Sequence, residues 1–130
     1  MKNYPAVPEL STPRGYSYVV TATGTMVFVA GQIALDKEGN VVGKGDLRAQ
    51  TVQVLENVKA CLAAAGATFA DVVKLNTYVV NLKAEDLPVI REVRSGYLPP
   101  SNAPASTMVG VTALAIEGLL VEIEAVAVID

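Results

Sequence analysis

The segment that most constrains the fold lies at the end of the chain, where residues 119–130 read LLVEIEAVAVID. Side chains of a β-strand alternate between the two faces of a sheet. The odd-numbered positions here are all apolar, which is typical of a face that packs under helices. The even-numbered positions from 120 to 128 are also apolar apart from Glu122 and Glu124, and a buried carboxylate is costly without a partner. The pattern predicts a strand covered on both sides, with a polar spot on its second face.

The rest of the chain alternates between strand patterns and helix patterns. Residues 1–14 contain three prolines and predict an extended, irregular arm. Period-2 patterns predict strands at 15–22, 25–34, 71–82, 106–111 and 119–129, and helical spacing predicts helices at 46–65 and 85–97. Asp46 is the expected N-cap of the first helix, and Gly66 is its expected stop. The order β-β-α-β-α-β-β predicts one α+β domain over residues 1–130, with both helices on one face of a mixed sheet.

The composition is unusually apolar for a chain that works alone. Charged residues make up 18% of the sequence, against a usual value of about 25%, and hydrophobic residues make up 52%. A symmetric oligomer would hide the excess apolar surface. A neighbouring subunit on the even-numbered face of the last strand would explain why that face is mostly apolar and still carries two glutamates.

The residue types that are missing exclude several classes of function. Histidine is absent, which excludes His-based triads, HExxH zinc sites and any imidazole base, and leaves carboxylates, hydroxyls, backbone groups and bound water for any catalysis. Cys61 is the only cysteine and is expected to be a small core residue. The net charge is −3 and the basic residues form no run, so no nucleic-acid partner is expected. No segment reads as a leader or a membrane span, and we expect a cytoplasmic protein.

Several motifs together resemble one known family. They are FVAGQ (28–32), Gln50 and Asn57 on the first predicted helix, the AAGA turn (64–67), APASTMVG (103–110) and VEIEAVA (121–127). The chain resembles the RidA/YjgF family, whose members were once named endoribonuclease L-PSP. The resemblance implies a chorismate-mutase-like fold and a barrel-like homotrimer with a cleft at each subunit interface. The best-known members hydrolyse reactive imines and enamines, such as 2-iminopropanoate, to 2-keto acids and ammonia without a cofactor.

The resemblance also implies roles for single residues. Glu122 matches the acidic residue that positions or activates the hydrolytic water, a task suited to a carboxylate. Gly31, preceded by Ala30, matches the position whose backbone meets the substrate, and a glycine inside a strand often marks such an approach. Tyr16 and Tyr18 bracket the position of the tyrosine that caps the cleft. Each position also has a structural reading: an interface carboxylate, a bulge glycine and two packing tyrosines.

One departure from the family pattern concerns substrate binding. Deaminases of the family carry an arginine after Pro-Ala, which grips the substrate carboxylate, whereas this chain has Ser106 there. Losing a buried, charged hydrogen-bond pair typically costs about 2–5 kcal/mol. Ser106 and Thr107 could bind a neutral or carbonyl-bearing ligand, or they could be turn residues without a contact. Met108 matches a position that lines the cleft wall.

The missing charge could come from elsewhere in the chain. Arg14 and Arg91 are the candidates that could reach the cleft, although Arg91 and Arg94 are expected to lie on a solvated helix face.

The sequence leaves three possible functions. The first is a RidA-like hydrolase with altered specificity for a small imine, enamine or related metabolite. The second is a non-catalytic trimer that binds a small ligand, and the third, an endoribonuclease, is disfavoured by the absence of histidine and by the pI of about 4.9.

Overall fold

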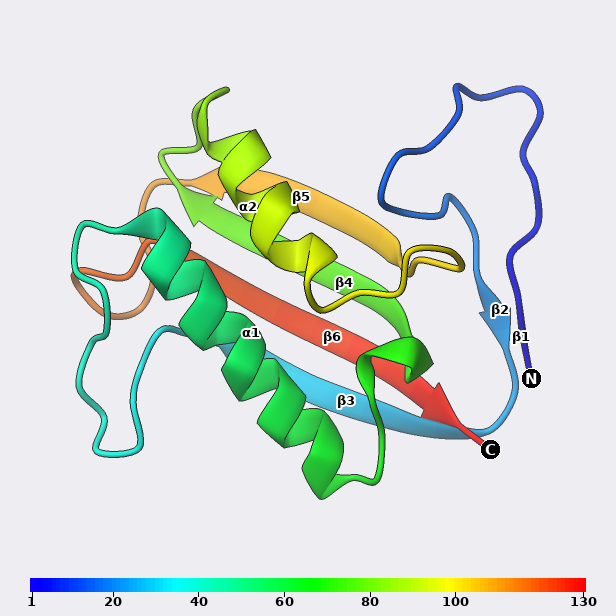
Figure 1. The fold of residues 1–130 in the computed structure, drawn as a ribbon, viewed down its shortest axis with the longest axis horizontal. Helices are drawn as coiled ribbons and strands as arrows, with labels where there is room; N and C mark the ends of the chain where they lie inside the picture. The colour runs from blue at the N-terminus through cyan, green and yellow to red at the C-terminus, as the bar shows by residue number, and fades with distance from the viewer.

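A four-stranded mixed sheet in the order β3-β6-β4-β5 forms the centre of the computed structural model, which describes residues 1–130 (Figure 1). The strands are β3 (Thr25–Gln32), β4 (Val72–Val80), β5 (Ala105–Val111) and β6 (Val121–Ile129). Strand β6 runs antiparallel to both of its neighbours, β3 and β4, whereas β5 runs parallel to β4. The parallel pair requires a crossover connection, and α2 supplies it.

Both helices, α1 (Leu47–Ala64) and α2 (Asp86–Ser95), cover the same face of this sheet (Figure 1). The α+β arrangement expected from the sequence is therefore confirmed. The Asp46 carboxylate accepts a hydrogen bond from the Ala49 N–H at 3.0 Å and caps α1. Gly66, with φ of +77°, follows the end of α1 in the left-handed conformation that glycine tolerates best. A short 3₁₀ turn, η1 (Phe69–Asp71), leads into β4. Neither helix has the length and apolar content needed to cross a membrane.

Strand β6 divides its side chains between the two faces of the sheet as its sequence predicts. Val121, Ile123 and the alanines at 125 and 127 are buried under the helices. Glu122 and Glu124 lie on the opposite face, which we call the open face because no helix covers it (Figure 1). Met26 and Phe28 of β3 are 57% and 72% exposed, and Val109 of β5 is also exposed. An apolar surface of this kind is what the composition predicts for a chain that associates with copies of itself.

The prediction of a strand over residues 15–22 is largely wrong. Only Thr21–Ala22 (β2) forms a strand, and it pairs with Lys2–Asn3 (β1) of the supposedly irregular arm. Ser17 makes a single parallel bridge to Ala105, the first residue of β5. Pairing cannot extend further back because Pro104 has no N–H to donate, although its carbonyl accepts from the Ser17 N–H at 3.0 Å.

Two polar residues of α1 hold loops in place from inside the fold. Gln50 is fully buried: its amide donates to the Gly118 carbonyl at 2.9 Å and accepts from the Leu120 N–H at 2.7 Å. Asn57 donates to the carbonyls of Ile33 and Leu35, at 2.9 and 3.1 Å. Both side chains thus have a structural role: Gln50 satisfies backbone groups just before β6, and Asn57 satisfies those just after β3.

Candidate functional site

An irregularity in β3 brings its backbone against Glu122. Val29 pairs with Ala125 and Gln32 pairs with Ile123, so β3 carries one residue more than β6 over this stretch. Such a bulge changes the direction of the strand and of its side chains. Gly31 lies in the bulge, and a β-carbon at this position would overlap the Glu122 carboxylate. A residue without a side chain is therefore required for Glu122 to hold its place.

The two glutamates of β6 share the open face but differ in their partners. Glu124 Oε1 accepts hydrogen bonds from Tyr78 Oη at 2.6 Å and from Asn76 Nδ2 at 3.3 Å. The hydrogen bond to Glu124 also raises the pKa of Tyr78. Glu122 accepts no hydrogen bond from the protein, although it is only partly exposed. Glu124 is thus fixed by its neighbours, whereas the Glu122 carboxylate has its lone pairs free for water or a ligand.

Other predicted site residues lie on the open face as well. Ala30 is exposed next to Gly31 on β3. Thr107 of β5 pairs with Asn76, and its hydroxyl accepts a hydrogen bond from Lys74 Nζ at 2.9 Å. Thr107, Asn76 and Glu124 lie opposite one another in one row across three strands, whereas Glu122 lies in the next row, opposite Tyr78.

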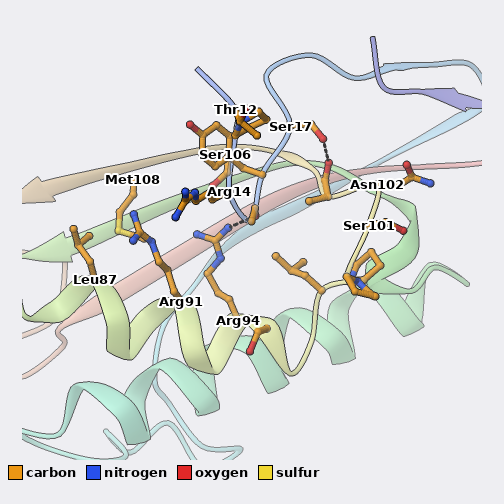
Figure 2. Close-up of a pocket in the computed structure, with 18 residues that line it drawn as sticks. Thr12, Arg14, Ser17, Leu87, Arg91, Arg94, Ser101, Asn102, Ser106 and Met108 are labelled. Atoms are coloured by element: carbon orange, nitrogen blue, oxygen red, sulfur yellow. Dashed lines mark hydrogen bonds between the residues drawn. The ribbon is translucent and has the colours of Figure 1, made fainter. Parts of the chain in front are cut away.

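Ser106 and Met108 point to the other face of the sheet. They pair with Leu75 and Thr77 of β4, both of which are fully buried under the helices. Because β5 is an edge strand, Ser106 and Met108 are not sealed in the core and instead line a cleft of about 1080 Å³. The cleft, which we call the edge cleft, lies between β5, α2, the segment 12–17 and the loop 98–103 (Figure 2).

Three arginines line the edge cleft. Arg91 and Arg94 come from α2 and Arg14 from the N-terminal segment, and Figure 2 shows their side chains extending into the cleft. Arg94 corrects the expectation of a solvated helix face, because it is only 8% exposed. Its Nη2 donates to the Gly15 carbonyl at 3.4 Å, and no carboxylate pairs with it. Burial, and secondly the charge of Arg91, lower the pKa of the Arg94 guanidinium.

The two candidate cap tyrosines are placed differently. Their rings pack edge to face, with centroids 5.5 Å apart. Tyr16 lines the edge cleft near Ser106. Tyr18 instead lines a smaller hollow of about 400 Å³ under the N-terminal arm, where its hydroxyl shares a hydrogen bond of 2.9 Å with Ser11. Of the two, Tyr16 is the one that lines the same cleft as Ser106.

The predicted site residues thus form two groups within one protomer. Ala30, Gly31, Thr107 and Glu122 lie on the open face, whereas Tyr16, Ser106 and Met108 line the edge cleft. Strands β6 and β5 are two positions apart, which is about 10 Å at the usual spacing, and the two groups lie on opposite sides of the sheet. A small molecule in the edge cleft therefore lies across the sheet from Glu122 of the same protomer, although Ser106 and Thr107 are neighbours on β5. No three His, Cys, Asp or Glu side chains come together in a way that could hold a metal ion.

The sequence interpretation missed Arg94. A signal was available, because Arg91 and Arg94 are three residues apart and therefore neighbours on one side of a helix. Ile90 and Val93 are buried on the same short helix, which turns the adjoining Arg94 toward the sheet rather than toward solvent.

Comparison with known proteins places the chain in one family. The family model for endoribonuclease L-PSP matches residues 8–129. A RutC family protein of Pyrococcus abyssi is 43% identical over 104 residues, which are 80% of this chain and 79% of the relative. A protein of Dermatophagoides farinae named 2-iminobutanoate/2-iminopropanoate deaminase is 35% identical over 126 residues, 97% of this chain and 93% of the relative.

The likeness extends to solved structures. The crystal structure of YyfB from Yersinia pestis, a Rid family protein described as of unknown function, superposes with a TM-score of 0.86 and 41% identity, covering 98% of each chain. A family model that spans nearly the whole chain, relatives above 30% identity and a matching fold all agree. The chain is therefore a member of the RidA/YjgF family, also known as the endoribonuclease L-PSP family.

Proposed function

We propose that this protein hydrolyses the C=N bond of a small, reactive imine or of the imine tautomer of an enamine. The observation that carries the proposal is the Glu122 carboxylate, which lies against the backbone of Gly31 and has no partner in the protein. A partly buried carboxylate with free lone pairs is suited to hold and deprotonate a water molecule. The deaminase name of a relative that is 35% identical supports this reaction class.

The reaction needs only water and a proton shuttle. Glu122 accepts a proton from water as the water oxygen attacks the imine carbon, and the protonated carboxyl passes this proton to the nitrogen, which gives a neutral carbinolamine. The carboxylate then takes the hydroxyl proton of the carbinolamine and passes it to the amino nitrogen. The C–N bond breaks, ammonia leaves and the carbonyl forms. The overall change, imine plus water to ketone plus ammonia, is balanced without an oxidant or reductant.

We further propose that the reaction takes place in clefts shared by neighbouring subunits of a homotrimer. The exposed apolar side chains of Met26, Phe28 and Val109 lie on the same open face as Glu122 and favour a second copy there. Association would bring the Glu122 group of one subunit toward the edge cleft of the next. Shared clefts would reunite the two groups of site residues that a single protomer keeps apart.

The substrate preference should differ from that of a typical family deaminase. Ser106 carries no charge where the clamping arginine is expected, so the carboxylate of 2-iminopropanoate has no partner at that position. The direct test measures the hydrolysis of 2-iminopropanoate by the purified protein and by the Glu122→Gln and Ser106→Arg variants. We expect weak activity in the unmodified protein, none above background in Glu122→Gln, and an increase in Ser106→Arg. Equal rates in the unmodified protein and Glu122→Gln would favour a non-catalytic binding protein instead.

Mixed trimers test the shared cleft. Ser106→Trp should block the edge cleft, and Glu122→Gln should remove the base, so each homotrimer is expected to be inactive. If each cleft combines two subunits, an equal mixture refolded together should regain about a quarter of the clefts in intact form, by random assembly of a closed ring. If one subunit supplies the whole site, the mixture should stay inactive. Glu122→Gln mixed with itself is the matched control.

A further inference from the structure

We propose that the edge cleft is a binding site for a compact anion with two negative charges, held by Arg14, Arg91 and Arg94. These are three of the four arginines in the whole sequence, and they come from two segments far apart in the chain. The dicarboxylate or phosphate oxygens of such a ligand are what a guanidinium group binds best, by paired N–H donors.

The charge of the edge cleft is not neutralised within the protein. Its 18 lining residues include three arginines and no aspartate or glutamate. The three ion pairs of the structure lie elsewhere: Met1 with Asp130, Lys2 with Asp71 and Arg48 with Glu92. The long hydrogen bond from Arg94 to the Gly15 carbonyl uses one of its five N–H donors. Burying an unpaired charge costs free energy, and an anion that pairs with the Arg94 guanidinium would offset this cost.

The arginines are held in place by the fold. Arg91 and Arg94 are three residues apart on α2, so both reach the same side of the helix. Arg14 is carried by the N-terminal segment, which is anchored to the start of β5 by Ser17. The Ser17 N–H donates to the Pro104 carbonyl at 3.0 Å, and its hydroxyl donates to the Ala103 carbonyl at 2.6 Å. Figure 2 shows the second of these bonds as the dashed line at Ser17.

The number of charges indicates the class of ligand. One arginine suits one carboxylate, whereas three converging arginines repel each other and are best satisfied by at least two negative charges. Neutral donors in the cleft, among them Ser106 and Asn102, can complete the coordination of the remaining oxygens. If the proposed function holds, the anion is the substrate, an imine that carries two acidic groups. The proposal that the cleft binds a dianion does not depend on that function.

Isothermal titration calorimetry of the purified full chain tests the site. The probes are malonate and inorganic phosphate as dianions, propionate as a monoanion, and malonamide as the neutral analogue of malonate. We expect a dianion to bind at least about tenfold more tightly than propionate, with affinity falling as NaCl rises, and malonamide not to bind. Tighter binding of malonate than phosphate would identify a dicarboxylate ligand, and the reverse a phosphorylated one.

Variants show whether the arginines hold the anion. Arg91→Gln, at an exposed position that folding does not need, should weaken dianion binding by about tenfold or more. Arg94→Lys keeps the charge but loses the paired donors, and it should also bind more weakly. Arg48→Gln is the matched control, since Arg48 is the one arginine outside the cleft, and it should bind as the unmodified protein does.

Three results would overturn the proposal: no dianion binding by the unmodified protein, equal affinity for malonate and malonamide, or unchanged dianion affinity in a folded Arg91→Gln variant. A loss of oligomeric state in Arg91→Gln, without any dianion binding by the unmodified protein, would instead assign the arginines to contacts with acidic residues of a second copy. The two proposals fail separately. Dianion binding without imine hydrolysis contradicts only the proposed function, and hydrolysis that is unaffected by the arginine variants contradicts only the anion site as the substrate site.

Discussion

The carboxylate of Glu122 occupies the space that a β-carbon on Gly31 would need. The two residues lie on neighbouring antiparallel strands, where a bulge in β3 brings the glycine backbone toward the side chain on β6. The glycine is therefore explained by the position of a carboxylate, and not by an unusual backbone conformation, since Gly31 has no positive φ. A β-carbon added at Gly31 would displace the Glu122 carboxylate without deleting it, and so tests whether the position of that carboxylate matters for activity.

Gly31→Ala should displace the Glu122 carboxylate while leaving the protein folded. The atoms in the way are those of a flexible side chain, so Glu122 can swing aside at modest cost in stability. Imine hydrolysis should fall at least about tenfold, because a base moved from its productive position loses most of its effect. Thermal unfolding and steady-state hydrolysis are the two measurements. Gly96→Ala is the control for a glycine replacement, since Gly96 is exposed, has a negative φ and would place its Cβ no closer than 3.4 Å to another atom. Full activity in Gly31→Ala would contradict the placement of the base.

Glu124→Gln should lower stability without removing activity from the folded fraction. Gln keeps the shape of the side chain but turns the 2.6 Å hydrogen bond from Tyr78 into a neutral one. We expect the free energy of unfolding in urea to fall by about 1 kcal/mol, the usual difference between charged and neutral hydrogen bonds. Tyr78→Phe combined with Glu124→Gln in a double-mutant cycle should show coupling between the two residues. Unchanged stability with lost activity would assign to Glu124 the role proposed for Glu122.

Phe28→Asp should weaken the proposed trimer. Phe28 is 72% exposed on the open face, and a carboxylate buried against a neighbouring subunit would be left unpaired. Sedimentation equilibrium should give three times 13.6 kDa for the unmodified protein and a shift toward 13.6 kDa for the variant. Val52→Asp, which places the same change at an exposed position on α1, should leave the oligomer intact. A monomeric unmodified protein at micromolar concentration would contradict the trimer and the shared cleft together.

Stability should decline at high pH because of Tyr97. Burial, and secondly a 2.7 Å hydrogen bond to Glu56, raises the pKa of Tyr97 to about 12 from a usual value of 10.0. The folded state then keeps a proton that the unfolded chain has lost, so the free energy of unfolding falls as the pH rises from 10 to 12. The contribution is fully present below pH 10. Urea unfolding at pH 8 and 11 should show a smaller decline for Tyr97→Phe than for the unmodified protein, and equal declines would contradict the assignment.

Much of the fold followed from local patterns in the sequence. The alternation in residues 121–129 predicted which side chains of β6 lie under the helices and which lie on the open face. The N-cap Asp46 and the glycine at 66 marked the ends of α1 to within about a residue. These features are local, because the 2-residue repeat of a strand and the 3.6-residue turn of a helix relate side chains that are close together in the sequence. The segment 15–22 failed because its pairing depends on a distant edge strand that begins only after Pro104.

The candidate site was predictable only in part, for the same physical reason. The sequence by itself determined that Glu122 and Glu124 share one face and that Ser106 replaces a charged residue of the family pattern. The sequence also led us to expect that Glu124 would be satisfied by hydrogen bonds and Glu122 open to water, but only the tertiary structure identified the partners of Glu124, because Asn76 and Tyr78 belong to β4. The tertiary structure also decided that Arg14 meets the two arginines of α2 some eighty residues later in the chain. Period and propensity act between near neighbours, whereas a charged cleft is made by segments that only the packing of the whole chain brings together.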